Sequence, residues 1–483
     1  MTILAIDQGT TSTRALVLGE GGARLVGARE HRQHYPAPGR VEHDPAELLR
    51  DVAACLDVAP PDVAAVGIAN QGESCLAWDA DTGEAVGPVI VWQDDRTRDV
   101  TARLCAQGCE DIVRERSGLP LDPYFSASKL AWIVREIPEA RRLAARGRLR
   151  LGTTDAYFRD RLAGRFETDV STASRTSLMN LSTCEWDADL CALFGVPPEA
   201  LPPIGPSAGD LGAVSCGGRR VPLAASLVDQ QAAVYGHGCR APGEAKITCG
   251  TGAFMLAVTG PGRPAATAGA LPTVLWQRAG EAPVHGLDGG VYAAGAAVNW
   301  ARRIGLFTDF AEIDAFGKPP AILRGLAFVP ALPGLACPHW DRAARGTFLG
   351  LSLDTDRADM AQAVLEGVAL RIAEVARGLG GTVPLASPVA LDGGMSANPW
   401  FAQFLANALG LDLRVSAVAD VTAIGAAAMA AEAVGAEAAG AEAAGAEATR
   451  AATGRIVEAT PLPEEVHRRF AAAVASARSF ATA

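Results

Sequence analysis

Hydrophobic and polar positions form a distinctive block pattern at the start of the chain. Ile3–Ile6 and Ala15–Leu18 are apolar, and the residues between them are mostly polar. Short apolar runs that flank Gly, Thr and Ser are typical of two strands joined by a turn, so this segment predicts a β-hairpin. The pattern returns halfway along the chain, where Ala245–Thr248 and Ala253–Val258 flank the turn Cys249–Gly252. The two hairpins indicate two halves of related design.

The second half also carries the clearest helical patterns. Apolar residues recur every three or four positions over Met360–Leu379, which predicts a helix that faces the core. Asn398 is placed to cap a helix that has Pro399 at its first position. By contrast, Pro206–Pro222 is rich in Gly, Pro and Ser and predicts irregular surface structure. The five-residue repeat Gly435–Ala448 predicts a frayed helix or a mobile surface loop without function, because each glycine costs a helix roughly 0.8–1 kcal/mol.

Composition limits the classes of function. The chain has 483 residues, which suffices for two or three domains. Its 49% hydrophobic and 20% charged residues exclude intrinsic disorder as the dominant state. The net charge of −11 argues against a nucleic-acid partner, although small anions can still bind locally. Only three of the 43 Lys and Arg residues are lysine, a bias that we attribute to codon composition rather than to function.

Cysteine spacing and hydropathy predict a cytoplasmic protein without a membrane partner. The ten cysteines are far apart, the nearest pair being Cys105 and Cys109, and no Cys-x-x-Cys occurs. This pattern favours neither a zinc site nor a disulfide framework, and it suits a reducing compartment. Met1 leads directly into Ile3–Ile6 without the features of a signal peptide. The longest uncharged stretch, Gly393–Leu411, contains too many polar residues for a membrane span.

The two hairpin turns are the first candidates for chemistry. The chain has no P-loop, no dinucleotide-binding Gly-x-Gly-x-x-Gly and no His-Glu-x-x-His helix, so a nucleotide would need another scaffold. Asp7–Ser12 supplies a glycine, three hydroxyl groups and a carboxylate for a hydrated cation, and Arg14 adds a charge for a phosphate. An ordinary polar turn is the alternative. The matching turn Gly250–Gly252 favours the functional interpretation, because two opposed hairpins can clamp one polyphosphate between two domains.

Short motifs that are typical of a known family run through nearly the whole chain. They are Asp7–Ser12, Val41–Pro45, Val91–Gln93, Asp122–Ser126, Asp229–Gln231, Gly250–Gly252, His339–Asp341 with Arg345–Gly346, and Asp392–Gly394. In this order and spacing they resemble the FGGY family of carbohydrate kinases, and within it the glycerol kinases. The resemblance implies an α/β fold of two actin-like (ribonuclease H-like) ATPase domains with an interdomain catalytic cleft. Residues 1–238 would bind the acceptor and residues 239–483 the nucleotide.

The resemblance also assigns roles around ATP and Mg²⁺. Asp229 matches the catalytic base that accepts the proton of the attacking hydroxyl, with a helix cap as the alternative. Asp7 matches an indirect Mg²⁺ ligand. Contacts to the phosphates fall on Thr10, Thr11, Ser12, Arg14 and Thr251, and contacts to the adenine nucleotide on Gly295, Asn299, Gly394 and Asn398. Gly295 could equally serve helix packing, and Asn299 stands where glycerol kinases usually carry glutamine.

For the acceptor, the resemblance implies a small polyol or sugar and points to one unusual position. The matching residues are Glu73, Trp92, Tyr124, Asp229 and Gln230, with Phe254 near the wall; Trp92 and Phe254 could instead be core aromatics. Glycerol kinases carry arginine where this chain has Gly72. Each lost charge-assisted hydrogen bond would cost about 1.5–3 kcal/mol with glycerol, so we hypothesise a larger C4–C5 polyol or ketose such as erythritol or xylulose. A compensating arginine from elsewhere in the chain stays possible.

Two further expectations concern alternatives and assembly. A non-catalytic actin-like scaffold or sugar sensor is the competing function, but it would not need Asp229 together with both hairpins. The family commonly forms homodimers and homotetramers. The loop Cys216–Arg220 is shorter than the loop that binds fructose bisphosphate in regulated members, so we do not expect that inhibition.

Overall fold

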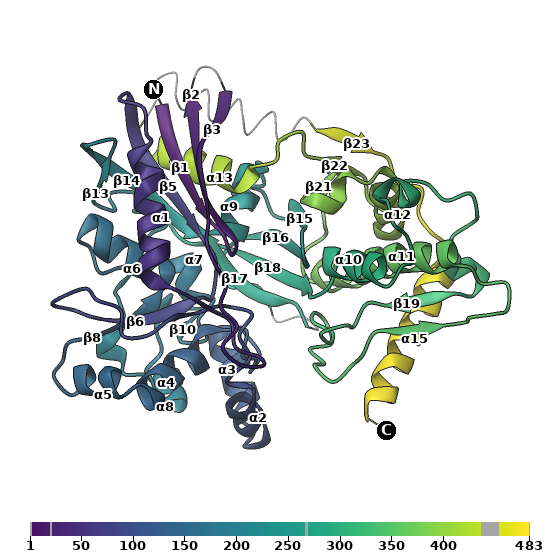
Figure 1. Cartoon of the computed structure of the whole chain (residues 1–483), viewed down its shortest axis with the longest axis horizontal. Coiled ribbons are helices and arrows are strands. Elements are labelled where there is room, and N and C mark those ends of the chain that lie inside the picture. The colour runs from purple at the N-terminus through teal and green to yellow at the C-terminus, as the bar shows by residue number, and fades with distance from the viewer. Residues whose placement is uncertain (1, 20–21, 266–268, 436–453, 483) are drawn as a thin grey trace.

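The computed structural model describes residues 2–19, 22–265, 269–435 and 454–482, and its two large sheets lie side by side (Figure 1). The first sheet contains, in spatial order, β13 (Ala213–Cys216), β14 (Arg219–Val228), β5 (Val63–Asn70), β1 (Thr2–Gln8), β2 (Ser12–Gly19) and β3 (Gly22–Glu30). The second contains β17 (Leu271–Trp276), β18 (Val284–Val291), β16 (Ala253–Pro261), β15 (Ala245–Cys249), β21 (Val389–Asp392), β22 (Leu413–Val415) and β23 (Arg455–Val457).

Both sheets repeat one strand plan. In the first, the hairpin β1–β2 continues into antiparallel β3, and β5 and β14 follow on the other side of β1 as parallel strands. In the second, the hairpin β15–β16 continues into antiparallel β18, and β21 and β22 are the parallel strands. The prediction of two halves of related design is therefore confirmed.

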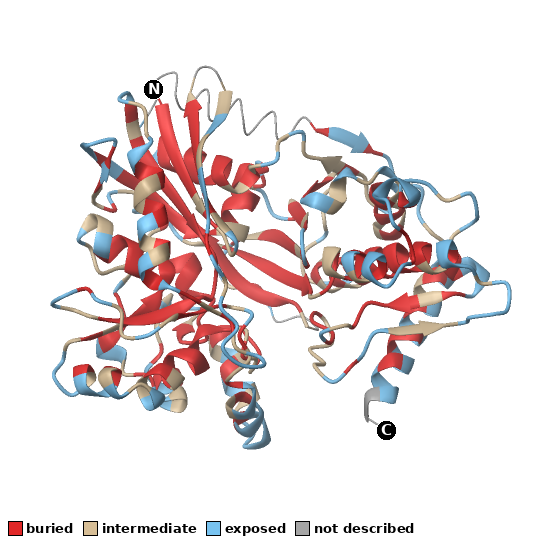
Figure 2. Cartoon of the chain, in the orientation of Figure 1, coloured by how far each residue is buried: buried red, intermediate tan, exposed pale blue. Residues whose placement is uncertain are grey.

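The alternation of side chains along β1 explains how the first sheet is covered. Leu4 and Ile6 pack with helix α1 (Pro45–Asp57), whereas Ile3 and Ala5 pack with α9 (Asp229–Gly236) and α13 (Val421–Ala433) on the opposite face. Residues of β16 and β17 belong to the same hydrophobic cluster as α9 and α13. These two helices therefore lie between the sheets, and Figure 2 shows that this central region is buried.

Small residues allow the close approach of α9 and α13. A Cβ atom on Gly425 would collide with the carbonyl oxygen of Ala232 in α9.

The predicted boundary after residue 238 falls in the loop between α9 and β15, but α13, from the second half of the chain, packs on the first sheet.

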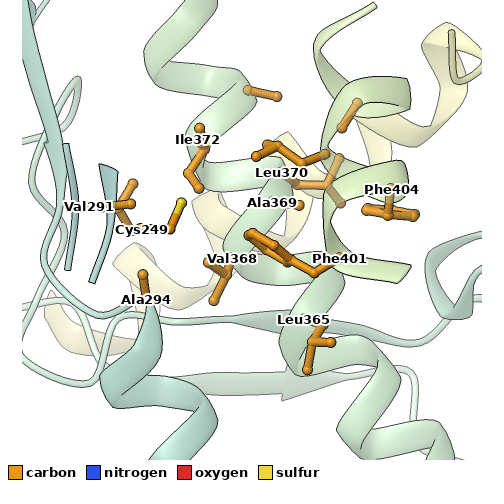
Figure 3. Packing of buried hydrophobic residues seen from close by; sticks show 14 of the residues in the cluster. Cys249, Val291, Ala294, Leu365, Val368, Ala369, Leu370, Ile372, Phe401 and Phe404 are labelled. Atoms are coloured by element: carbon orange, nitrogen blue, oxygen red, sulfur yellow. The ribbon is translucent and has the colours of Figure 1, made fainter. Parts of the chain in front are cut away.

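The second half has its own core around α11 (Arg357–Gly380) and α12 (Pro399–Leu409) (Figure 3). The predicted helix over Met360–Leu379 is confirmed. The cap is confirmed as well, since the Asn398 side chain accepts a hydrogen bond of 2.7 Å from the backbone N–H of Phe401.

The prediction for Pro206–Pro222 is partly wrong. Its second part forms the hairpin β13–β14, whose turn residues Gly217 and Gly218 have φ angles of 54° and 75°. Two glycines with positive φ suit the tight turns that join antiparallel strands, and buried Val214 and Val221 anchor the pair to the core. The repeat Gly435–Ala448 lies, beyond its first residue, outside the described residues.

The remaining elements surround these two cores. A third sheet is formed by β4 (Glu42–His43), β7 (Val89–Ile90), β6 (Cys75–Asp79) and β8 (Leu149–Thr153). Two-stranded pairs are formed by β10 (Met179–Asn180) with β11 (Glu185–Trp186), β12 (Ile204–Gly205) with β9 (Thr168–Asp169), and β19 (Ala327–Val329) with β20 (Thr347–Leu349). The other α-helices are α2 (Arg98–Ala106), α3 (Glu110–Ser117), α4 (Ser126–Glu136), α5 (Pro138–Ala144), α6 (Thr154–Phe158), α7 (Val170–Ala173), α8 (Ala188–Phe194), α10 (Gly295–Arg303) and α15 (Glu464–Thr482). Within the described ranges, no helix combines the length and apolar character needed to cross a membrane.

Candidate active site

Three strand ends meet at one edge of the first sheet. Gln8 of β1 pairs in register with Asn70 of β5, which in turn pairs with Val228 of β14. Because parallel strands present their carboxyl ends at the same edge, the segments that follow them converge there. This edge therefore brings together the first hairpin turn, the Gly72–Glu73 turn and Asp229.

The second sheet repeats the arrangement. Thr248 of β15 pairs with Asp392 of β21, so the turn Gly250–Gly252 lies beside the segment that follows Asp392. The start of α10 is fixed to this turn by backbone hydrogen bonds, including one of 2.9 Å from Gly295 N–H to the Gly250 carbonyl. The hairpin turn and the amino end of α10 thus form one unit.

A cavity of about 200 Å³ lies between these two edges. Its lining includes the predicted residues Thr10, Gly72, Glu73, Trp92, Tyr124, Asp229, Gln230, Thr251 and Phe254. Both hairpins contribute, Thr10 from the first half and Thr251 from the second. The volume is smaller than that of drug-sized pockets, which span about 300–1,000 Å³, and suits a small polar ligand.

Asp229 stands at the first position of α9 and faces this cavity. Its Oδ1 accepts a hydrogen bond of 2.6 Å from the backbone N–H of Gln230. Burial, together with the negative charges of Asp7 and Glu73, raises the pKa of Asp229 to about 7, against the backbone hydrogen bond and Lys246. A carboxyl group with a pKa near neutrality is well matched to general-base chemistry.

Aromatic and acidic side chains form another part of the cavity wall. Trp92 and Tyr124 meet edge to face with their ring centroids 5.6 Å apart. The indole N–H of Trp92 donates a 3.0 Å hydrogen bond to Thr10 Oγ1, which ties this wall to the first hairpin. Glu73 has a φ of 57°, an uncommon left-handed backbone for a residue with a side chain. Such strain is typical of functional sites, and here the turn holds a buried carboxylate at the cavity.

A second cavity of about 530 Å³ adjoins the turn Gly250–Thr251. Thr251, Gly295, Asn299, Gly394 and Asn398 line it, together with the apolar side chains Val298, Leu365 and Phe401. A Cβ atom on Gly295 would lie 2.6 Å from the Gly250 carbonyl oxygen, so glycine is required for the close approach of α10 to the turn. Asn398 Nδ2 donates to the Ile313 carbonyl at 2.9 Å, so this side chain also fixes the cavity wall.

Three residues predicted to contact phosphates stand apart from these cavities. Thr11, Ser12 and Arg14 are not in the described lining of either cavity. Arg14 instead forms a 2.9 Å ion pair with Asp420, and its side chain is about half exposed. Their phosphate contacts stay predictions.

Comparison with known proteins identifies the fold and the family together. The family model for the N-terminal domain of the FGGY family of carbohydrate kinases matches residues 2–236, and that for the C-terminal domain matches residues 245–434. The chain belongs to the FGGY family of carbohydrate kinases. It is therefore an ATP-dependent kinase with the actin-like two-domain fold, as the sequence motifs predicted.

Individual proteins similar to this FGGY kinase are glycerol and xylulose kinases. The glycerol kinase of Thermus brockianus is 42% identical over 438 residues, which are 88% of each chain. The crystal structure of Plasmodium falciparum glycerol kinase with ADP superposes with a TM-score of 0.89 at 27% identity, covering 99% of this chain and 98% of that one. The ligand-bound xylulose kinase of Lactobacillus acidophilus shares the fold, with a TM-score of 0.83 at 22% identity over 100% and 98% of the chains.

The FGGY kinase site contains charged residues that the motifs did not indicate. Arg175 and Asp288 line the first cavity and form a 2.9 Å ion pair between the two halves of the chain. The Arg175 Nε–H also donates to Glu73 Oε1 at 2.7 Å. An arginine thus reaches the cavity from another segment, with its guanidinium held by Glu73 and Asp288.

Two buried lysines donate hydrogen bonds to residues that line the first cavity. Lys129 Nζ donates to the Tyr124 carbonyl at 2.9 Å, and Lys246 Nζ donates to Gln230 Oε1. Neither lysine is exposed. The chain has only three lysines among its 43 Lys and Arg residues, and two of them take these buried positions.

The carboxylates of the site suit a magnesium ion that arrives with the nucleotide. Burial raises the pKa of Asp7 to about 6, and the charge of Asp7 contributes to the raised pKa of Asp229. A cation near these two half-buried carboxyl groups would offset their repulsion. Among the described residues, no cluster of three or more His, Cys, Asp or Glu side chains is placed to hold a metal.

Proposed function

We propose that this kinase transfers the terminal phosphoryl group of ATP to a hydroxyl of a small polyol or sugar held beside Asp229. The observation that carries the proposal is the composition of the first cavity. Asp229, the side chains of Glu73, Trp92 and Tyr124, and residues of both hairpin turns all line the same 200 Å³ space. The nucleotide would occupy the adjoining 530 Å³ cavity, whose apolar side chains suit a base and whose Thr251 edge leads to the acceptor.

Asp229 would act on the proton of the acceptor hydroxyl. As the acceptor oxygen forms its bond to the γ-phosphorus, the bond from that phosphorus to the bridging oxygen breaks, and ADP leaves with the electron pair. Phosphoryl transfer passes through a loose transition state, so the carboxylate mainly orients the hydroxyl and accepts its proton late. The products are a phosphate monoester and ADP.

Other residues of this chain would orient the reactants and shield them. Glu73 and Gln230 offer hydrogen bonds to acceptor hydroxyls, while Trp92 and Tyr124 cover its carbon atoms. Thr10 and Thr251 would meet the phosphates from opposite sides. Mg²⁺ held through Asp7 would neutralise charge on the phosphate oxygens. A cavity closed by aromatic side chains excludes water, which would otherwise compete as the acceptor.

A polyol and sugar panel with ATP and magnesium tests this function. The wild-type enzyme should phosphorylate at least one member, and Asp229→Asn should lose about 10²–10⁴-fold in kcat while it still binds ATP. Asp44→Asn is the matched control, because Asp44 caps α1 through a 2.9 Å hydrogen bond from Ala46 N–H but lies outside both cavities. If Asp229 were only a helix cap, the two variants would behave alike.

The competing scaffold or sensor function predicts another outcome. If the wild type and Asp44→Asn both bound nucleotide but phosphorylated no panel member, the proposed acceptor chemistry would be refuted.

A further inference from the structure

The acceptor cavity has a second polar end formed by Arg175 and Asp288. Arg175 follows α7 and is only 3% exposed; Asp288 belongs to β18 of the other half and is 7% exposed. The Arg175 guanidinium donates a 2.7 Å hydrogen bond from Nε–H to Glu73 Oε1, and its Nη2 forms a 2.9 Å ion pair with Asp288 Oδ2. Its position is therefore fixed by two buried carboxylates.

Each of these two side chains keeps one buried polar atom without a partner. Within the described part of the chain, neither Arg175 Nη1 nor Asp288 Oδ1 makes a hydrogen bond. Leaving a buried charged group unsatisfied is costly, so such atoms in a cavity wall point to a ligand. Nη1 can only donate and Oδ1 can only accept, and a hydroxyl group is the small polar group that does both.

The unpartnered pair lies at the end of the cavity away from phosphoryl transfer. A small hollow of about 10 Å³ continues the main cavity and shares Tyr124, Arg175, Phe254 and Asp288 with it. Gly290, Tyr292 and Trp340 close this hollow, whereas Asp229 and the two hairpin turns line only the main cavity. Its size is about that of one water-sized probe, so it accommodates a single hydroxyl.

Gly72 contributes no side chain to the lining of the main cavity. A Cβ atom there would have, among the described residues beyond its chain neighbours, only Val228 Cγ1 within 4 Å, at 3.2 Å. No side chain at position 72 therefore separates the acceptor from Glu73 and Arg175.

We infer that Arg175 and Asp288 form a subsite for a distal hydroxyl of an acceptor with four or five carbons, at the opposite end from the phosphorylated hydroxyl. The inference rests on the proposed function and adds the length of the acceptor and the residues that select it. Arg175 donates through Nη1 and Asp288 accepts through Oδ1. Because one residue comes from each half, a long acceptor also bridges the two halves of the chain.

Steady-state kinetics of the full chain with ATP and magnesium provide the first test. Glycerol is compared with tetritols, pentitols and the corresponding ketoses. At least one C4 or C5 acceptor should exceed glycerol in kcat/KM by tenfold or more. A kcat/KM for glycerol that equals or exceeds every C4 and C5 value overturns the subsite, while phosphoryl transfer to glycerol would still support the proposed function.

Asp288→Asn provides the second test, because it keeps the size of the side chain. If its amide oxygen accepts from Arg175, its NH₂ group faces the hollow and donates where Oδ1 accepted. KM for the preferred acceptor should rise by about 10–100-fold and KM for glycerol by less than threefold, with KM for ATP unchanged. Asp210→Asn is the matched control, since Asp210 also pairs with an arginine, Arg165 at 3.2 Å, but is exposed.

Two measurements keep this test decisive. Thermal unfolding of Asp288→Asn reports whether the variant folds; if it does not, Arg175→Lys replaces it, because lysine keeps the charge beside Glu73 but loses Nη1. Equal losses for glycerol and for longer acceptors would overturn the subsite, because a merely structural role affects all acceptors alike. Turnover of no acceptor by the wild type would instead refute the proposed function itself.

Discussion

Replacing Arg175 by methionine tests how the buried charges of the site are balanced. Arg175 lies between two carboxylates, Glu73 at 2.7 Å and Asp288 at 2.9 Å, and all three side chains are at least nine-tenths buried. Methionine fills similar space but leaves both carboxylates without their counter-ion. Removing one partner of a buried ion pair typically costs 3–5 kcal/mol.

The size of the expected effect follows from that range. For domains of 150–250 residues, about 1 kcal/mol shifts the unfolding midpoint by 2–4 °C. Arg175→Met should therefore lower the midpoint near pH 8 by roughly 6–20 °C. The additional change Glu73→Gln removes one of the two uncompensated charges and should recover part of this loss.

The pH dependence gives the prediction its sign. Burial already raises the pKa of Glu73 and the Arg175 charge opposes that rise, so the variant should raise it further. A carboxyl with a raised pKa in the folded state destabilises the protein at pH values above its unfolded pKa of about 4.3. The stability difference between wild type and variant should therefore be largest at pH 8 and shrink as the pH falls and Glu73 takes up a proton.

Thermal unfolding at matched ionic strength from pH 5 to pH 8 measures this difference. Arg165→Met is the control, because its partner Asp210 is exposed, and exposed pairs contribute about 0–1 kcal/mol. A midpoint difference for Arg175→Met that stayed constant across the pH range would refute the reasoning, since lost packing alone does not titrate.

Three further predictions concern the reaction. Because Asp229 has a pKa of about 7 and must be ionised to accept a proton, kcat/KM should fall below about pH 7 in a pH–rate profile, with the acid limb moving lower at saturating MgATP; a flat profile down to pH 5 would contradict this. Gly295→Ala should raise KM for ATP about tenfold or more with little change for the acceptor, because the added Cβ would lie 2.6 Å from the Gly250 carbonyl oxygen; an unchanged KM for ATP would show that the turn adapts freely. Lys129→Arg should raise KM for the acceptor more than KM for ATP, because a larger guanidinium must displace the Tyr124 backbone that Lys129 holds at 2.9 Å.

The hairpins and the long helices could be predicted because their signals are local. Alternating apolar runs around a Gly and Thr turn, and the spacing over Met360–Leu379, report on neighbours within a few residues. The cavity-lining residues were predicted through the family resemblance, and among them Asp229 and the two hairpin turns follow the carboxyl ends of strands. Gly72 also follows the carboxyl end of a strand, β5, and lines the first cavity.

Arg175 could not be found in this way. Its contact with Glu73 joins residues 102 positions apart, and its contact with Asp288 crosses between the halves. In a chain with 43 Lys and Arg residues, no local feature separates this arginine from those on the surface. Only the three-dimensional fold shows that its charge is buried and shared by two carboxylates.

The lysines offered more information than their number suggests. A lysine ammonium is more compact than a guanidinium and has fewer donors to satisfy. Lys129 and Lys246 are both buried, and each donates a hydrogen bond to a residue that lines the first cavity. Lys318, on the surface, pairs with Asp359 at 2.8 Å. Two of the three lysines therefore lie at buried positions beside the first cavity, whereas the third is a surface residue.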